Sequence, residues 1–265
     1  MTSENSLTDN QPVLFHRPKR FHFEWVAGVI FRPRQIFEKI AGQHTGVWLT
    51  PMFILTLTTL ILVLVNGSVQ QKMAMQGEVS LPPGYEYYTP EQQAQFQSAM
   101  SATSSPVFVY VLPMIAGVFK VWIGWLLVGG LIHLLLTMLG GRGDTGAAMN
   151  LVAWASLPFA LRDLIRAGAL LVSQKTISAP GLAGFAPSNG TDWGIFLIAF
   201  LGLVDIYLIW HIVLLIVGAR TTQGLTGAKA ATAVILTILL VVSLQALIGF
   251  LTGKLSGLTI IRPFF

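Results

Sequence analysis

The feature that most constrains this chain is a series of uninterrupted apolar stretches that recur along the sequence. Several approach about 20 residues, the length that crosses the hydrocarbon core of a bilayer as an α-helix. The composition agrees, because 54% of the residues are hydrophobic and 10% are charged, whereas soluble domains have about 45–50% apolar and about 25% charged residues. The sequence therefore predicts an integral membrane protein of the all-α class.

The apolar stretches predict a polytopic transmembrane helical bundle with five spans. Within a membrane domain over residues 47–253, the expected spans are residues 48–65, 107–139, 147–172, 193–218 and 230–251. The second stretch is too long for one perpendicular span and too short for two with a turn. We expect one long helix that projects from the membrane or bends at Pro113, and a re-entrant or paired arrangement stays open. In the third span, Pro158 can open the helix and free backbone carbonyls.

Three polar regions flank these spans. Residues 1–46 form an N-terminal tail in which apolar residues recur at helical spacing on both sides of Pro33. This pattern predicts two short amphipathic helices on the cytoplasmic membrane surface, with a flexible basic tail as the alternative. Residues 66–105 form an outer loop in which Pro90 marks the start of a small helix. Residues 254–265 form a short C-terminal segment.

The distribution of lysine and arginine predicts the orientation, because cytoplasmic flanks of membrane spans carry an excess of these residues. With the N-terminus inside, nine flanking basic residues lie on the cytoplasmic side and four lie outside. The inner set is Arg17, Lys19, Arg20, Arg32, Arg34, Lys39, Arg142, Arg220 and Lys229, and the outer set is Lys72, Lys175, Lys254 and Arg262. We therefore expect a cytoplasmic N-terminus and an extracytoplasmic C-terminus.

The sequence lacks the signatures of several function classes. The net charge is +5, but six of the sixteen basic residues precede the first span, where they fit topology signals and lipid contacts better than a nucleic-acid face. The absence of cysteine excludes disulfides, thiolate metal ligands and thiol catalysis. There is no His-Glu-x-x-His pair, Gly-x-Ser-x-Gly elbow or phosphate-binding loop. We expect no enzyme activity, no cofactor and no nucleic-acid partner.

Polar side chains inside the expected spans are the main candidate site. They are Lys120, Arg162, Asp163, Arg166, Asp205 and Gln245. Counted from the outer span ends, Arg162 and Asp205 both lie about 18 Å deep at 1.5 Å per residue, so we expect Asp205 to contact Arg162 or Arg166. Charges at this depth are costly unless they are paired or hydrated. The layer is therefore either an ion-pair network that fixes helix packing or a polar pocket on a transport path.

Two histidines form a second candidate group nearer the cytoplasmic face. His133 and His211 each lie about 10 Å from the inner end of their span. Two imidazoles can bind a metal or titrate near neutral pH. No third ligand is visible in the sequence, so we expect interhelical hydrogen bonds from these histidines rather than a metal site.

Four groups of residues at the span boundaries form a further pattern. They are residues 32–41 with Trp48 and Pro51, the Gly140-Gly141 pair followed by residues 153–158, residues 205–210, and the connector over residues 218–230. In order and placement, over about residues 32–253, they resemble the Yip-one domain family, the Ypt-interacting membrane proteins of eukaryotes and many bacteria.

The resemblance implies five spans and a cytosolic N-terminus. Eukaryotic members are linked to Rab-type GTPases and vesicle traffic, and some bacterial members accompany ABC-transporter and adaptor assemblies. The outer loop, residues 66–105, is longer than the usual first loop of the family. We expect a non-enzymatic scaffold or accessory protein of a bacterial plasma membrane that assembles with a membrane partner. A small-solute or ion channel or transporter is the alternative, and homo-oligomerisation stays open.

Overall fold

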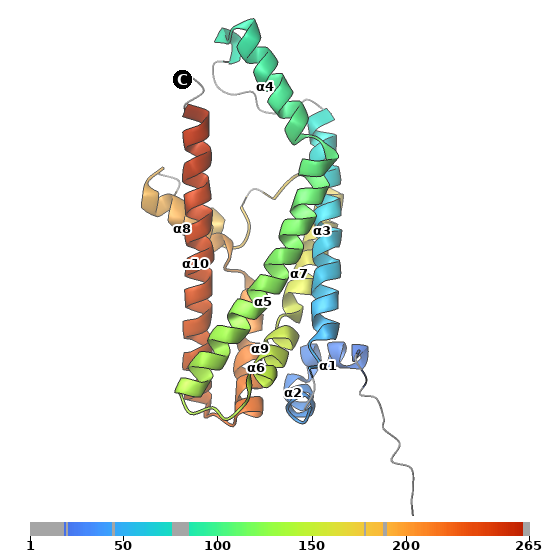
Figure 1. Cartoon of the computed structure of the whole chain (residues 1–265), viewed down its shortest axis with the longest axis vertical. Coiled ribbons are helices and arrows are strands. Elements are labelled where there is room, and N and C mark those ends of the chain that lie inside the picture. Colours follow the sequence, from blue (N-terminus) through green and yellow to red (C-terminus); the bar gives the residue numbers. More distant parts are fainter. Residues whose placement is uncertain are drawn as a thin grey trace, which may run out of the picture.

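The structure, a computed structural model, describes residues 19, 21–43, 46–75, 85–177, 179–187 and 190–261. Within these residues the chain is all-helical and has no strand. Four helices are long and apolar enough to cross a membrane: Leu49–Met73, Val107–Met138, Ile206–Gln223 and Gly227–Lys254. They stand side by side along the long axis of the molecule (Figure 1). The prediction of an all-helical protein with several apolar helices is therefore confirmed.

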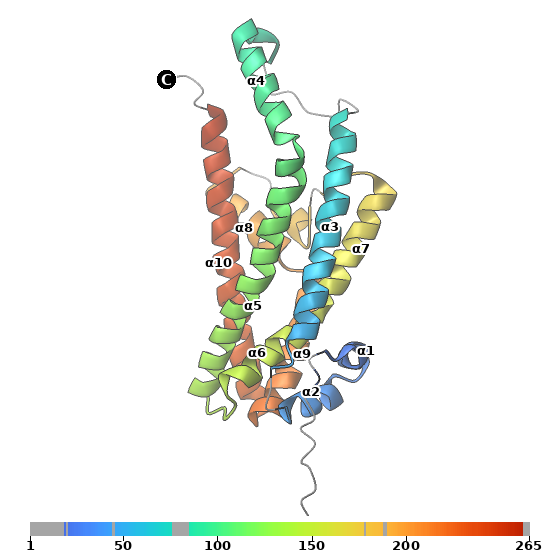
Figure 2. The ribbon, with the colours of Figure 1, turned by 45° about the vertical axis from the view of Figure 1, so that its right-hand side comes forward.

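The third expected span, residues 147–172, is two helices rather than one. Helix α6 (Thr145–Ala155) ends at Ser156, and α7 (Leu157–Ser173) begins directly after it. Pro158 explains the break, because a proline has no backbone N–H to donate to the preceding turn. Together the two helices run from the lower to the upper end of the bundle (Figure 2).

The fourth expected span, residues 193–218, is also divided. Helix α8 (Asp192–Gly202) ends before a short irregular stretch, and α9 (Ile206–Gln223) begins after Asp205. Asp205 has an extended backbone with φ −141° and accepts a hydrogen bond from the Leu208 N–H, 2.9 Å away. This is N-cap geometry, which starts a new helix. Asp205 thus lies at a helix boundary and not, as expected, inside a continuous fourth helix.

The second expected span is one long helix. A π-helical segment (Val107–Val111) leads directly into α5 (Leu112–Met138), so the chain continues past Pro113 without turning back. Helix α3 (Leu49–Met75) is longer than the expected first span, residues 48–65. Its upper end is joined to the π-helical segment by a hydrogen bond of 3.1 Å from the Tyr110 hydroxyl to Gln71 Oε1.

The two ends of the bundle differ. At the upper end, α4 (Pro90–Thr103) rises beyond α3 and α5, and α10 (Gly227–Ile261) ends on the same side (Figures 1 and 2). Part of the expected outer loop and of the expected C-terminal segment is therefore helical. Residues 76–84 of that loop and residues 262–265 lie outside the described residues.

At the lower end, two short helices lie across the base of the bundle (Figure 1). They are α1 (Val26–Phe31) and α2 (Pro33–Ala41), which correspond to the two helices predicted around Pro33. The apolar face of α2 is buried against α9 and α6. This face is therefore part of the protein core. Residues 1–18 of the expected tail lie outside the described residues.

The main core lies where α2, α6 and α9 meet. Phe37 and Leu151 are fully buried there, and a side chain at Gly218 would collide with Leu151 and crowd Phe37. The link between α2 and α3 is fastened to α6, because the Val47 N–H donates to Asn150 Oδ1 at 2.9 Å and Trp154 Nε1 donates to the Val47 carbonyl at 3.1 Å. Buried packing and these hydrogen bonds thus hold α2, α6 and α9 together at the base of the bundle.

Candidate functional site

Asp205 is the centre of a charged layer at the break between α8 and α9. While its Oδ1 caps α9, its Oδ2 lies 3.2 Å from Arg166 Nη2 and 3.8 Å from Arg162 Nη1. Its side chain is 10% exposed within the protein. The expected contact between Asp205 and the arginines of the third span is therefore present. Because α7 places its two arginines one turn apart, both reach the same carboxylate.

Asp163 is the second carboxylate of the layer, and it connects α7 to α3. Arg162 Nε lies 3.4 Å from Asp163 Oδ1, and the Thr59 hydroxyl donates to Asp163 Oδ2 at 3.0 Å. The Arg162 guanidinium also lies over the Phe159 ring, with its Cζ 4.7 Å from the ring centroid. The face of an aromatic ring attracts a cation in this position. The two arginines and the two aspartates of this network carry equal and opposite charge.

The other two polar residues predicted for this layer lie outside the network. Lys120, on α5, has an exposed side chain and makes no hydrogen bond or ion pair with the described residues, but it lies close enough to Arg162, Asp163 and Arg166 to interact with them electrostatically. Gln245 is exposed on α10. Conversely, Thr59 belongs to the network and was not predicted, because a threonine in an apolar helix carries no distinguishing signal in the sequence.

The two candidate histidines occupy different environments. His211 is buried, and its Nδ1 donates to the Ala155 carbonyl at 2.8 Å. That carbonyl is available because the break at Ser156 removes its helical partner. His133 is half-buried on α5, and its Nδ1 has no partner in the described part of the chain. His211 is thus an interhelical hydrogen-bond donor. The residues that the structure describes contain no group of three side chains that could bind a metal ion.

A segment between α7 and α8 folds back to the level of the α8–α9 break, which the sequence did not predict. The Leu182 N–H donates to the carbonyls of Leu201 and Val204, at 2.9 and 3.1 Å. The Leu201 carbonyl, in the last turn of α8, also accepts from the Val204 N–H at 3.1 Å, so the Leu182 N–H adds a second hydrogen bond to it. Gly181 allows the close approach, because its φ is +59° and a Cβ there would lie 2.6 Å from the Val204 oxygen.

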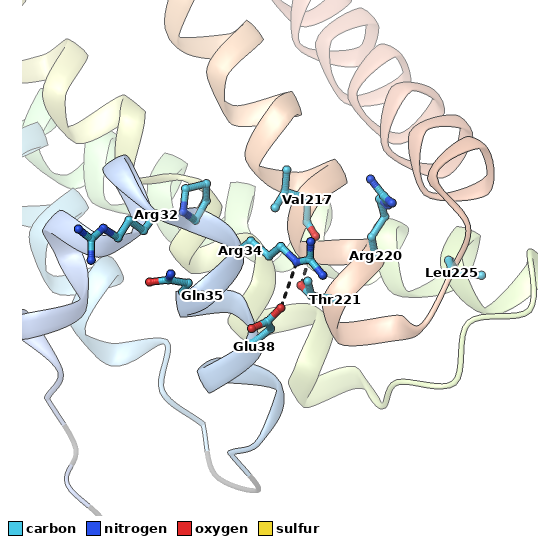
Figure 3. Close-up of a pocket in the computed structure, with 9 residues that line it drawn as sticks. Arg32, Arg34, Gln35, Glu38, Val217, Arg220, Thr221 and Leu225 are labelled. Carbon is cyan, nitrogen blue, oxygen red and sulfur yellow. Dashed lines mark hydrogen bonds and ion pairs between the residues drawn. The ribbon is translucent and has the colours of Figure 1, made fainter.

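A separate polar feature is a groove at the base, between the first turns of α2 and the end of α9 (Figure 3). Its volume is about 710 Å³. We call it the basal groove, and it is lined by Arg32, Pro33, Arg34, Gln35, Glu38, Val217, Arg220, Thr221 and Leu225. From the sequence alone its arginines indicate only the side of the membrane, because nothing in the sequence shows that α2 and α9 are neighbours.

Comparison with known proteins gives one family. Residues 27–249 match the family model described as the Yip1 domain, which covers most of the chain and nearly all of its described helices. No curated protein and no solved structure matches the chain. The geometry above is therefore the main guide to what the individual residues do.

Proposed function

Because the chain belongs to the Yip1 domain family and is an integral multi-pass membrane protein, we propose that it is a non-enzymatic scaffold that assembles with a membrane partner, such as a transporter or a trafficking complex. The observation that carries this proposal is the network of paired charges on α7 and at the start of α9. Each of its four charged groups has a partner within the chain. Charges that pair with one another inside a helical bundle link the helices that carry them, which fits a structural role.

The proposal includes a topology with five crossings, in which α6 and α7 together form the third and α8 and α9 the fourth. Helices α6 and α7 span residues 145–173, which at 1.5 Å per residue is about 43 Å and enough to cross a bilayer. The positions of α2 and of the end of α10 at opposite ends of the bundle support an odd number of crossings. The basic residues of the base favour a cytoplasmic N-terminus, and we propose a bacterial plasma membrane as the location.

Single cysteines test this topology, since the chain has no cysteine of its own. Gln95 on α4 and Thr226 in the α9–α10 connector are both exposed. Gln95→Cys should react with a membrane-impermeant thiol reagent in intact cells, and Thr226→Cys should react only after the membrane is opened. Labelling of Thr226→Cys from outside would contradict the proposed orientation.

Copurification tests the scaffold role. The tagged full chain is extracted from native membranes with a mild detergent, with and without prior chemical crosslinking, and its partners are identified by mass spectrometry. We expect one membrane complex to be recovered in stoichiometric amount. Recovery of the chain alone under both conditions would refute the proposal.

A transport role is the second candidate, and one observation favours it. Helices α7 and α9 both begin next to the charged layer, and broken helices of this kind form the substrate sites of many transporters. Flux assays on reconstituted vesicles separate the two functions. A scaffold predicts no solute or ion flux above empty vesicles, whereas a transporter predicts flux that is lost in Asp205→Asn even when the variant is folded.

A further inference from the structure

We propose that the basal groove binds the phosphate group of an anionic phospholipid, with the acyl chains of this lipid lying along α9. The groove contains three arginines and one carboxylate. Arg34 is neutralised locally, because its Nε lies 3.1 Å from Glu38 Oε1. Neither Arg32 nor Arg220 has a side-chain hydrogen bond or ion pair with any residue that the structure describes. The groove therefore has two uncompensated positive charges.

The donors of the groove suit a phosphate group. A guanidinium presents several N–H groups in a planar fork that matches phosphate oxygens, so arginine is well suited to a bidentate contact. Helix α2 starts in the groove with Pro33 in its first turn and has no side-chain cap. Its N-terminal backbone N–H groups add a partial positive charge on the same side. Arg32 and Arg220 line the groove from two different elements, and their side chains lie on either side of the Arg34–Glu38 pair (Figure 3).

The surroundings of the groove indicate a lipid rather than a free phosphate ion. Ile206, Ile209 and Val213 recur at helical spacing on α9 and are 66%, 53% and 50% exposed. The same face continues through Val217, which lines the groove, to Arg220. An apolar stripe that leads into a basic groove matches a molecule with acyl chains attached to a phosphate. Phe31, directly before Arg32 in the chain, is 81% exposed and offers a further apolar side chain.

The charge of the groove favours a phosphomonoester over a phosphodiester headgroup. A monoester carries about −1.5 to −2 near neutral pH, which balances the charges of Arg32 and Arg220. A diester, as in phosphatidylglycerol, carries a single negative charge and leaves one of the two arginines uncompensated. The volume of about 710 Å³ accommodates a headgroup, since small-molecule sites are commonly about 300–1,000 Å³. We therefore expect a preference for phosphatidic acid over phosphatidylglycerol, and for both over phosphatidylcholine.

Native mass spectrometry of the purified full chain in detergent tests the site. The protein is titrated with phosphatidic acid, phosphatidylglycerol or phosphatidylcholine of the same acyl composition, and the fraction with one bound lipid is measured. The test variant is Arg32→Gln with Arg220→Gln. The matched control, Lys39→Gln with Arg142→Gln, removes two exposed positive charges at the same end of the molecule from residues that do not line the groove. Arg220→Lys retains the charge but not the planar fork.

The expected results are specific to the groove. The control should bind phosphatidic acid as the natural sequence does, and the test variant about tenfold or more weakly, since two charge-assisted hydrogen-bond donors are lost. Arg220→Lys should lie between them. Equal lipid binding by the test and control variants would overturn the proposal. Displacement of all binding by inorganic phosphate, with no preference among the lipids, would show an anion site and refute the lipid assignment. A partner protein is not needed for this measurement, so its result is independent of the scaffold role.

Discussion

The charged layer and the basal groove both contain several arginines, but the arginines of the layer are paired with carboxylates and two of those in the groove are not. In the layer, Arg162 and Arg166 are offset by Asp163 and Asp205, and all four side chains are largely buried within the protein. In the groove, only Arg34 has a carboxylate partner, while the other two arginines line an open volume.

The difference follows from where each group lies. An unpaired charge in hydrocarbon costs several kcal/mol, whereas an arginine at the membrane surface can contact water and headgroups at little cost. Paired charges thus serve the fold in the layer, and unpaired charges are available to a ligand in the groove. Substitutions that remove charge should therefore affect stability in the layer and ligand binding in the groove.

The largest expected effect is that of Asp205→Asn. Asparagine can still cap α9, so the change mainly leaves Arg162 and Arg166 without their shared counter-charge. Breaking a buried ion pair from one side typically costs about 3–5 kcal/mol in the free energy of unfolding. The measurement is equilibrium unfolding in detergent, with a double-mutant cycle that adds Arg166→Gln.

The double variant Asp205→Asn with Arg166→Gln should regain part of the lost stability, because it removes the uncompensated charge together with its partner. Additive losses in the cycle would contradict the ion-pair interpretation and would weaken the contrast between the layer and the groove.

The next largest effect concerns the segment that folds back to the charged layer. Gly181→Ala should lower the free energy of unfolding by about 2–3 kcal/mol, because it adds the strain of a left-handed backbone to a clash with the Val204 carbonyl. Gly224→Ala is the control, since Gly224 also has a positive φ, +65°, but has open space around it. The control should lose only about 1–2 kcal/mol. Equal losses would show that the contact of Gly181 with the end of α8 is not important for stability.

A smaller effect is expected at Thr59. Thr59→Val keeps the shape of the side chain but removes the hydrogen bond to Asp163, so one oxygen of a buried carboxylate loses its donor. We expect a loss of about 1–2 kcal/mol, measured by the same unfolding assay. Thr252→Val is the matched control, because its hydroxyl bonds only to carbonyls within its own exposed helix turn. If Thr59→Val lowered the free energy of unfolding no more than Thr252→Val, the hydrogen bond from α3 to Asp163 would not contribute to stability.

The parts of this structure that the sequence predicted are those that depend on local hydropathy and on depth. Apolar length predicted the long helices, and equal distance from the outer span ends predicted the contact between Asp205 and the arginines of α7. The break at Asp205 was missed because its cause is not local. Asp205 can start a new helix there because Arg166 compensates its charge and the Leu182 N–H bonds to the carbonyls of Leu201 and Val204 beside the break.

The groove could not be predicted for a similar reason. Arg32 and Arg220 are 188 positions apart in the sequence, and only the packing of α2 against α9 brings them to one volume. The pattern of basic residues indicated the side of the membrane but not their convergence. Hydropathy thus predicts which residues are in the membrane, and the tertiary contacts determine which of them act together.

The smallest effect on stability, which is also the sharpest test of the contrast, is expected for Arg32→Gln with Arg220→Gln. Both side chains are exposed and have no partner in the described part of the protein, so their removal breaks no interaction of the fold. In lipid-free detergent the free energy of unfolding should change by no more than about 0.5 kcal/mol.

When phosphatidic acid is added, the natural sequence should become more stable as the lipid concentration rises, because a ligand that binds only the folded state shifts the unfolding equilibrium. The variant should lose most of this increase, and Lys39→Gln with Arg142→Gln should retain it. A large loss of stability in lipid-free detergent would show that these arginines belong to the fold, as those of the charged layer do, and the distinction between the two regions would fail.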